Sequence, residues 1–444
     1  MTFNEALEYI HSLLKFGIHP GLSRMDTLLQ ILGNPHKNIK CVHVAGTNGK
    51  GSTSTAISNI LIEAGYDVGL YTSPYVTHFL ERVQYNGKPI DENLFAKCVE
   101  IIKPEIEKMS EQGAQITEFE ALTATAFLCF SELNVDVLVL EVGLGGRLDA
   151  TNVIDTPLVN VITSLSLDHT AVLGDKIEQI AFEKCGTLKQ DGTLVCSYGQ
   201  KESAMSVIKD ICKERNNTLI IPEQSEIEVT EQSIFGMQFN YKKQSYRTIL
   251  SGTHQVQNMT TVIEAVNVLK EKGYTITEEN IKNGILKTRL PARVEVISEN
   301  PLVILDGGHN EDGAKAFYNA VKDCFDSNKK LIVIAGMMND KAVENSLKPL
   351  ISKADTFIAV TPENPRAMKA EDLGEIAKKY CHNVLVCDNA NSAVDSVKMK
   401  ITENDMLFVV GSLYLAGEVR TNLLEYFKRL TEQLIYVKIQ NRFF

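Results

Sequence analysis

No two of the nine cysteines form a C-x-x-C pair, the spacing typical of zinc sites and redox disulfides. No apolar run approaches the roughly 20 residues that a membrane-spanning helix needs. Residues 1–15 read as an amphipathic helix with acidic side chains, unlike a signal peptide. The sequence therefore argues against a disulfide framework, a zinc site and a membrane span, and we expect a cytoplasmic protein.

Positive charge is scarce relative to negative charge. Lys and Arg number 45 against 56 Asp and Glu, which gives a formal net charge of −11. A chain of this charge is poorly suited to polyanions, so we expect neither nucleic acid nor an anionic membrane as partner. An anionic substrate must then be held by a few local basic groups and metal ions.

Apolar strand-like runs alternate with helical patterns through most of the chain, which predicts parallel sheets with helical crossovers. Strands are expected near 41–45, 67–71, 135–142, 157–163 and 193–197, and again near 302–306, 330–335, 356–360, 384–387 and 406–411. Helices are expected near 50–64, 91–109, 117–133, 175–189, 201–214, 254–272 and 277–287. A polar alternating stretch at 226–250 predicts an antiparallel β element appended to the first sheet, and the tail after Lys428 is expected to form a final strand or docking segment.

A length of 444 residues exceeds one typical core, and the segment 288–293 breaks the alternation of strands and helices. We therefore predict an α/β protein of two domains. Residues 1–292 should form a P-loop-type domain with a mostly parallel sheet, and residues 293–444 a Rossmann-like α/β domain.

The segment 43–52, His-Val-Ala-Gly-Thr-Asn-Gly-Lys-Gly-Ser, joins a predicted strand to a predicted helix. Glycines let main-chain N–H groups surround phosphate oxygens, the helix N-terminus adds partial positive charge, and Lys50 adds a full one. The usual P-loop has glycine where Val44 stands and a hydroxyl residue where Gly51 stands. An apolar helical stripe follows and stops before Gly65, which supports a phosphate-binding loop over a plain strand–helix turn.

Polar residues end three further predicted strands. Glu141 closes one strand, Asp168 and His169 follow the next, and Ser73 follows a third. Because the carboxyl ends of parallel strands share one sheet edge, these groups should lie beside the phosphates. Such an arrangement suits Mg²⁺, which takes few protein ligands together with phosphate and water oxygens. The alternative is that Glu141 and His169 are solvated loop residues, but their shared edge favours the metal site.

Lys184 falls on the apolar stripe of its predicted helix, three and seven residues after Ala181 and Ile177. A lysine there extends its amine to solvent, pairs with a carboxylate or loses its charge, and reaching solvent is the usual outcome. A neutral buried amine can instead react with CO₂ to form a carbamate. The carbamate oxygens would then be available to a second metal ion or to the γ-phosphate.

Two further motifs do not by themselves indicate a binding site. The run Gly143-x-Gly145-Gly146 lacks the third glycine of a dinucleotide fingerprint, and no helix is expected to follow it. Thr117-x-x-Glu120 is a capping box that opens the predicted helix 117–133. The pattern by itself gives Thr117 no role in substrate binding.

Polar residues also end two strands of the second part. Asp306 and His309 follow the strand near 302–306, and Ser412 follows the strand near 406–411. The second domain can therefore direct its crevice toward the first. We expect an active site between the domains, with a hinge near 288–298.

At this point the chain resembles the folylpolyglutamate synthase and dihydrofolate synthase family of the wider Mur ligase group, over nearly its whole length. The matching segments are HVAGTNGKGS (43–52), TSP (72–74), FLERV (79–83), TEFE (117–120), LEVGLGGRLDATN (140–152), LDH (167–169), LG (173–174), EK-x-G (183–186), GTHQVQN (252–258), DGGHN (306–310) and GSLYLAGEVR (411–420).

The resemblance implies an ATP-dependent amide ligase. In this family ATP phosphorylates a substrate carboxylate, the amine of L-glutamate attacks the acyl phosphate, and phosphate leaves. Metal ions and Lys50 would neutralise the transferring phosphoryl group, and two domains would bring the reactants together. We accordingly expect ATP as a substrate, two Mg²⁺ ions, small-molecule partners and, by family analogy, a monomer.

The resemblance also implies roles for individual residues. Catalytic positions are taken by Lys50, Lys184 and His309. Metal-binding positions are taken by Ser73, Glu141, His169 and Lys184, the last as an N6-carboxylated lysine. Nucleotide-binding positions are taken by Gly46, Thr47, Asn48, Gly49, Lys50, Gly51, Ser52, Asn258, Arg293 and Asp306. Glutamate and the acyl phosphate are expected to meet near His309 and Ser412.

The acceptor follows from residues 146–152, which resemble the bacterial bifunctional enzymes more than those restricted to polyglutamylation. The residues that match a dihydropteroate pocket in those enzymes are Arg82, Thr117, Phe119, Asp149 and Ala150. The resemblance thus implies that dihydropteroate and L-glutamate give dihydrofolate, with glutamate chain extension of reduced folates as a second activity.

Three positions depart from the family pattern. Tyr75 stands where His is frequent, Cys185 where Ala is usual, and Ala292 where Gly usually precedes Arg293. Tyr75 lies near the expected pterin side and bears on the choice of folate, not on the class of reaction.

Three other functions compete with this one. A ligase of folylpolyglutamates alone is one, and a muramyl-peptide ligase is another, against which the segments TEFE and GGRLDATN argue. The third is a nucleotide switch without ligase activity. Its guanine-specific Asn-Lys-x-Asp motif is missing, because Asn328-Lys329-Lys330-Leu331 lacks the aspartate.

Overall fold

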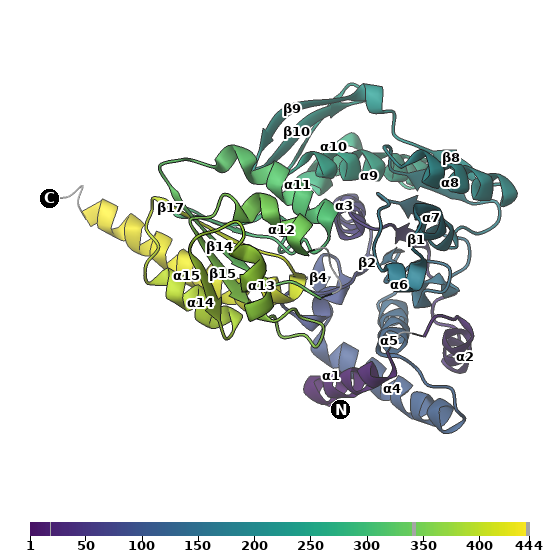
Figure 1. The fold of residues 1–444 in the computed structure, drawn as a ribbon. Coiled ribbons are helices and arrows are strands. Elements are labelled where there is room, and N and C mark those ends of the chain that lie inside the picture. Colours follow the sequence, from purple (N-terminus) through teal and green to yellow (C-terminus); the bar gives the residue numbers. More distant parts are fainter. Residues whose placement is uncertain (18, 340–342, 441–444) are drawn as a thin grey trace.

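The computed structural model describes residues 1–17, 19–339 and 343–440. Two α/β domains lie side by side: the first, purple to teal, and the second, green to yellow (Figure 1). The predicted two-domain α/β class is confirmed by the two separate sheets. No helix in the described part of the chain has the length and hydropathy to cross a membrane.

The first domain is built on an eight-stranded sheet of order β4-β3-β2-β5-β1-β6-β7-β8. Its parallel strands are β2 (Val68–Tyr71), β5 (Val137–Glu141), β1 (Cys41–Ala45), β6 (Val159–Ile162), β7 (Thr193–Cys196) and β8 (Thr218–Ile220). At the β2 edge, β3 (Val83–Tyr85) and β4 (Lys88–Pro89) pair antiparallel. The sequence did not predict β3, β4 and β8, because strands of two or three residues are too short to show a period.

Helices cover both faces of this sheet. One face carries α1 (Phe3–Ser12), α2 (Ser23–Ile31), α4 (Glu92–Glu111), α5 (Glu118–Glu132), α7 (Ile177–Cys185) and α8 (Glu202–Glu214). The other carries α3 (Lys50–Glu63), α9 (Thr253–Glu271) and α10 (Glu278–Lys287). Short turns of helix connect them: η1 (Leu13–Phe16), η2 (Phe79–Arg82), η3 (Ala150–Val153), α6 (Thr170–Leu173) and η4 (Gln224–Glu226).

The antiparallel element consists of β9 (Ile227–Ser233), β10 (Gly236–Tyr241) and β11 (Gln244–Thr248). The prediction that it extends the first sheet is wrong in this detail, because the three strands form a sheet of their own. Phe239, Tyr241 and Tyr246 are buried in the same core as α3 and α9. The small sheet therefore packs on helices rather than pairing with the edge of the large sheet.

The second domain has a six-stranded sheet of order β12-β13-β17-β14-β15-β16. The parallel strands are β13 (Leu302–Leu305), β17 (Asp405–Val410), β14 (Lys330–Ala335), β15 (Thr356–Val360) and β16 (Val384–Cys387). An antiparallel strand that the sequence did not predict, β12 (Glu295–Glu299), pairs with β13.

One face of this second sheet carries α11 (Glu311–Val321), η5 (Lys322–Cys324), α12 (Val343–Ile351) and α13 (Ala370–Ala377), and the other carries α14 (Ala390–Lys398) and α15 (Leu413–Gln440). The prediction of a final strand after Lys428 is wrong, because α15 continues to Gln440, and the alternative of a docking segment stays a prediction. Residues 441–444 lie outside the described part of the chain.

The two domains touch through α15 and the loop that follows β2. Val76 of this loop packs against the core formed by α14 and α15. A Cβ atom at Gly417 of α15 would overlap the Val76 carbonyl oxygen. Beside this contact, Arg420 of α15 pairs with Glu295 at 2.7 Å and reaches Thr77 Oγ1 at 3.5 Å. The two domains can therefore approach this closely only because Gly417 has no side chain.

We predict that Gly417→Ala weakens the packing between the domains. Alanine favours a helix over glycine by about 1 kcal/mol, but its methyl group would meet main-chain atoms, at a cost of about 1–3 kcal/mol. Thermal unfolding and the radius of gyration from X-ray scattering test this. We expect a lower Tm and a larger radius for Gly417→Ala, and no change for Thr421→Ala on the exposed side of the same helix. A rise in Tm, as helix propensity alone would give, contradicts the close contact.

Candidate active site

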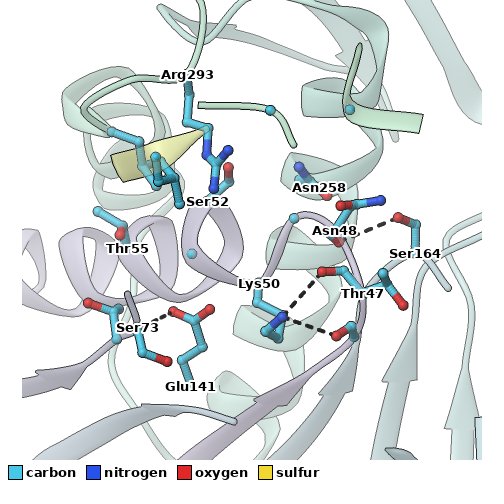
Figure 2. A pocket seen from close by; sticks show the side chains of 18 of the residues that line it. Thr47, Asn48, Lys50, Ser52, Thr55, Ser73, Glu141, Ser164, Asn258 and Arg293 are labelled. Carbon is cyan, nitrogen blue, oxygen red and sulfur yellow. Dashed lines mark hydrogen bonds between the residues drawn. The ribbon is translucent and has the colours of Figure 1, made fainter. Parts of the chain in front are cut away.

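A cavity of about 870 Å³ lies at the carboxyl ends of the strands of both domains (Figure 2). From the first domain it is lined by the loop 46–52 and by Ser73, Glu141, Asp168, His169, Lys184 and Asn258. From the second domain it is lined by Arg293, Asp306, His309 and Asn310. The site expected between the domains is therefore present as a cavity.

The loop 46–52 turns sharply from β1 into α3. Gly46 has φ 148°, and a Cβ atom there would overlap Thr163 Oγ1, so only glycine fits. The N–H groups of Thr47 and Asn48 donate to the Ser164 carbonyl at 2.9 and 3.3 Å. These two amides are therefore not available to phosphate as the sequence suggested. The anion-facing amides are those of the first turn of α3, which have no acceptor within the helix.

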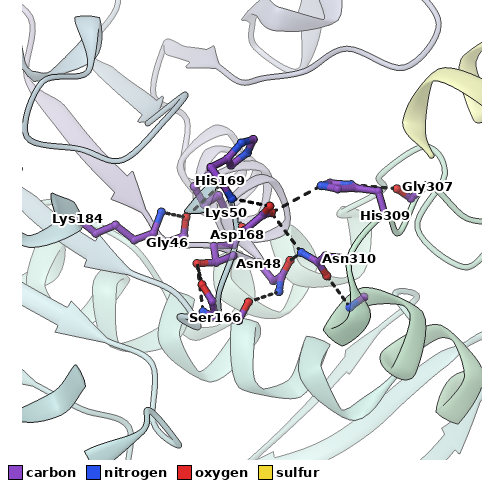
Figure 3. Close-up of polar contacts among 12 residues, drawn as sticks. Gly46, Asn48, Lys50, Ser166, Asp168, His169, Lys184, Gly307, His309 and Asn310 are labelled. Atoms are coloured by element: carbon purple, nitrogen blue, oxygen red, sulfur yellow. Dashed lines mark hydrogen bonds and ion pairs between the residues drawn. The ribbon is translucent and has the colours of Figure 1, made fainter. Parts of the chain in front are cut away.

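Two lysine amines converge on one carbonyl oxygen of this loop. Lys184 Nζ donates to Gly46 O at 2.7 Å, and Lys50 Nζ donates to the same oxygen and to Thr47 O, each at 3.2 Å (Figure 3). Lys184 is buried, as its place on the apolar stripe of α7 indicated, and its amine turns inward rather than to solvent. Burial, and secondly the charge of Lys50, lower the pKa of Lys184 to about 7. A large share of this amine is therefore neutral near neutral pH.

Glu141, the last residue of β5, is a buried carboxyl group. Its Oε2 accepts one long hydrogen bond, from the Ser73 N–H at 3.4 Å, and Figure 2 shows it opposite Lys50. Burial raises the pKa of Glu141 to about 7, against the opposing effect of Lys50. A buried carboxylate with so little hydrogen bonding suits a cation, which would remove the cost of its charge.

The four expected metal ligands do not converge. Ser73 and Glu141 are neighbours, but Lys184 lies across the loop, against Gly46. His169 begins α6 in a left-handed conformation with φ 50°, is exposed, and directs its ring away from Lys184 (Figure 3). Within the described ranges, no three His, Cys, Asp or Glu side chains form a metal-binding group. The residue types fit Mg²⁺ at Glu141, whereas the rest of the set is not assembled in this structure.

Asp306 holds the turn between the domains. Its two carboxylate oxygens accept the N–H groups of Val294 at 2.9 Å and Gly308 at 2.7 Å. Ala292 and Val294 both have positive φ, 54° and 46°, and between them Arg293 extends into the cavity. The positive φ of Ala292 explains why glycine is usual at this position in the family. Asp306 thus fixes the turn from which Arg293 extends into the cavity.

Glutamate and the acyl phosphate were expected to meet near His309 and Ser412, and of these two residues only His309 belongs to the cavity lining. His309 lines the cavity, with Nδ1 3.4 Å from Gly307 O and Nε2 3.8 Å from Asp168 Oδ2. Ser412 is buried, its Oγ accepts the Leu415 N–H at 3.1 Å at the start of α15, and it is not part of the cavity lining. The serine therefore stabilises a helix terminus in this structure.

The residues expected to bind dihydropteroate also lie outside this cavity lining. Arg82 pairs with Glu118 at 3.3 Å and lies over the Phe119 ring at 5.8 Å. Asp149 accepts the N–H groups of Leu144 at 2.8 Å and Thr151 at 3.0 Å, while Thr117 caps α5 and Ala150 is buried in η3.

In this structure Arg82 and Phe119 pack against each other and against neighbouring protein atoms. Phe119 lies so close to Gly143 that a Cβ atom there would touch its ring. The buried Nε of Arg82 has no hydrogen-bond partner among the described residues, so one donor of this cluster is available to a ligand. A bound pterin would need the Phe119 ring to move.

Asn310 is a cavity residue for which the sequence indicated no individual role, and Asp168 is one that was expected only at the sheet edge beside the phosphates. Asn310 Nδ2 donates to Asn48 Oδ1 at 3.2 Å and to Asp168 Oδ2 at 3.3 Å, which links the two domains. Its Oδ1 accepts the Gly313 N–H at 2.8 Å and caps α11. An Asn between a strand and a helix is a capping signal that can be recognised in the sequence. Its contact with the other domain cannot be recognised there.

We predict that Glu141→Gln stabilises the protein at pH 8 when no divalent metal or nucleotide is present. In the folded protein the pKa of Glu141 lies above the usual value of 4.5, so the protonated carboxyl group favours the folded state in acid. This contribution to the free energy of unfolding is lost as pH rises through about 7. Glutamine removes this penalty, which we put on the order of 2 kcal/mol at pH 8. Thermal unfolding at pH 4.5 and pH 8 should show a gain at pH 8 alone. An equal gain at both values would contradict a buried, ionising Glu141.

Comparisons with known proteins show the family of the chain. The Mur ligase middle domain matches residues 44–266, and the Mur ligase glutamate ligase domain matches residues 292–413. A dihydrofolate synthase/folylpolyglutamate synthase of Bacillus subtilis (strain 168) is 37% identical over 95% of this chain and 99% of its own length.

Solved structures show the same similarity. E. coli FolC in complex with DHPP and ADP has a TM-score of 0.82 and 30% identity, over 95% of this chain and 98% of that chain. Mycobacterium tuberculosis folylpolyglutamate synthase complexed with ADP and AMPPCP has a TM-score of 0.83 and 28% identity, over 95% and 99%. The chain belongs to the Mur ligase family, within its dihydrofolate synthase/folylpolyglutamate synthase group of amide-bond-forming ligases.

Proposed function

We propose that this protein uses ATP to join L-glutamate to dihydropteroate, forming dihydrofolate, and to the γ-carboxylate of reduced folates. One observation carries the proposal: a single cavity brings the helix start at Lys50 and the buried carboxylate of Glu141 opposite His309 of the second domain. The names of the relatives and the ADP and DHPP bound to E. coli FolC support these substrates.

The nucleotide would occupy the side of the cavity formed by α3. The free amides of its first turn and the Lys50 ammonium would hold the phosphates. Asn258 packs against Gly49, and Arg293 extends from the second domain toward Ser52 (Figure 2). These positions support the expected roles of Asn258 and Arg293 beside the nucleotide.

Mg²⁺ would be held by Glu141 with Ser73, and bound there it would neutralise charge on the phosphates. Lys50 supplies positive charge on the other side of the transferring phosphoryl group. The acceptor carboxylate displaces ADP from the γ-phosphorus and becomes an acyl phosphate. The glutamate amine then attacks the carbonyl carbon, the bond to phosphate breaks, and the nitrogen loses a proton.

Glutamate and acceptor would approach from opposite sides. His309 extends from the second domain into the cavity, in position to hold glutamate close to the acyl phosphate. The acceptor would enter beside Arg82, Phe119 and Asp149 and displace the Phe119 ring from its place over Gly143. Arg82 Nε, which lacks a partner, would donate to the ligand.

Lys184 would carry an N6-carboxyl group. Its neutral amine adds to CO₂ to give a carbamate and one proton, and the low pKa of Lys184, about 7, supports this step. The carbamate would place oxygen atoms next to Gly46 in a pocket shared with Lys50. A second Mg²⁺, with His169, would belong to this side of the site.

The proposal extends to the organisation of the chain. We place the domain boundary between residues 292 and 293, in the turn held by Asp306. ATP, L-glutamate and folates are cytoplasmic metabolites, so the enzyme would act in the cytoplasm. By its resemblance to the family, the enzyme would act as a monomer.

Glutamate-dependent release of ADP, with dihydropteroate or tetrahydrofolate as acceptor, tests the proposed function. We expect turnover with both acceptors, ATP and Mg²⁺, and none for Lys50→Ala, which removes the ammonium beside the phosphates. Turnover with tetrahydrofolate alone would restrict the enzyme to polyglutamylation. ATP hydrolysis that ignores glutamate would point to a nucleotide switch and contradict the ligase.

Carbon-13 NMR in labelled bicarbonate tests the modification of Lys184. We predict a carbamate signal at pH 8 that fades as pH falls below about 7, because protonation of the amine removes the nucleophile. Lys184→Arg should lose both the signal and the ligase activity. Lys189→Arg serves as the control, since burial also lowers the pKa of Lys189 but its amine bonds to Asn152 O instead. A signal that survives in Lys184→Arg contradicts the assignment.

A further inference from the structure

Asn310 is the point where the second domain is hydrogen-bonded to the phosphate loop. Asn310 is 8% exposed, and the oxygen and the nitrogen of its side-chain amide make separate contacts. The oxygen accepts the Gly313 N–H at 2.8 Å and caps α11 within its own domain. The nitrogen donates across the domain boundary to Asn48 Oδ1 at 3.2 Å and Asp168 Oδ2 at 3.3 Å (Figure 3).

The cap determines where the nitrogen points. With Oδ1 held by Gly313, the amide plane is fixed and both Nδ2 hydrogens face the first domain. Both acceptors there are themselves held. Asn48 donates its own Nδ2 to Ser166 Oγ at 3.2 Å, and the other carboxylate oxygen of Asp168 accepts the His169 N–H at 2.8 Å. The contact is therefore built from groups that are oriented on both sides.

The first-domain partners of Asn310 belong to the two loops nearest the phosphates. Asn48 lies two residues before Lys50, and Asp168 adjoins His169. On the second-domain side, His309 precedes Asn310 and reaches to 3.8 Å from the same Asp168 oxygen. The position of the phosphate loop and the position of His309 are thus joined through one amide.

We propose that Asn310 is a positioning residue that couples the phosphate loop to closure of the second domain and so places His309 for glutamate ligation. This inference rests on the proposed function for its kinetic consequence. The phosphates are held by the loop 46–52 of the first domain, and Arg293 is carried by the turn that Asp306 holds rather than by Asn310, so we expect the affinity for the nucleotide to change little without Asn310. Ligation of glutamate requires the second domain to be closed on the first, so this step becomes slower without Asn310.

Two variants separate this link from the helix cap. Asn310→Asp keeps an oxygen for Gly313 but replaces the donor with a second oxygen that faces Asn48 Oδ1 and Asp168. Asn310→Ser also keeps a capping oxygen and is too short to cross the boundary. The matched control is Asn389→Asp, because Asn389 caps α14 in the same way, accepting the Ser392 N–H at 2.8 Å.

Steady-state kinetics should separate kcat from the KM for ATP. Loss of two hydrogen bonds predicts a fall in kcat of about tenfold for Asn310→Ser and more for Asn310→Asp, because repulsion is added. The KM for ATP and the Tm should stay near the wild-type values, and Asn389→Asp should behave as wild type. An unchanged kcat in Asn310→Asp, or an equal loss in Asn389→Asp, overturns the proposal.

X-ray scattering without acceptor tests the link independently of the ligase activity. With a non-hydrolysable ATP analogue, the wild type should keep the smaller radius of gyration, and Asn310→Asp should show a larger one. Equal radii overturn the proposal even if the enzyme is a ligase. A wild type that ligates no glutamate, but whose radius still depends on Asn310, would overturn the proposed function and leave the link intact.

Discussion

The carbonyl oxygen of Gly46 accepts hydrogen bonds from two lysine amines, and the chemistry of the site depends on this crowding. Burial, and secondly the charge of Lys50 against the same oxygen, lower the pKa of Lys184 to about 7. Lys50 keeps a place beside the start of α3. The fold thereby places the amines of two lysines against the same carbonyl oxygen of the phosphate loop.

Hydrogen bonds from both domains hold the phosphate loop and its surroundings in place. The Ser164 carbonyl holds the N–H groups of Thr47 and Asn48, so the loop is anchored to β6 before any phosphate binds. Across the cavity, Asp306 holds the turn with Arg293, and Asn310 ties the second domain to Asn48. The phosphate loop is thus fixed from both domains, and the Phe119 ring packs against Gly143 nearby in the first domain.

Sequence patterns predicted the features that follow from hydrophobic periodicity and from the shared edge at which parallel strands end. The long strands and helices, the turn before α3, the capping box at Thr117 and the place of Lys184 on the apolar face of its helix all follow from spacing, and each is present. Spacing favoured a Lys184 amine that reaches solvent, whereas the structure buries it against Gly46. Glu141 and Ser73 could be placed together because parallel strands end at one edge. Short strands such as β3 and β8 were missed because they carry too few residues to show alternation.

What sequence could not give is the conformation of individual side chains. Matching residues placed Arg82 and Phe119 in an acceptor pocket, but here they pack against each other and Arg82 pairs with Glu118. Ser412 was expected in the cavity, yet its hydroxyl group is used at the start of α15. The link through Asn310 depends on how two domains meet, which no local pattern records.

The most direct measurement follows oxygen-18 from the carboxylate of labelled dihydropteroate during a single turnover with ATP and L-glutamate. Formation of an acyl phosphate transfers one carboxylate oxygen to the γ-phosphorus, and its breakdown leaves that oxygen on phosphate. The account predicts inorganic phosphate that carries one oxygen-18 atom for each amide bond formed. Unlabelled phosphate, released at the same rate as the amide product, would contradict it.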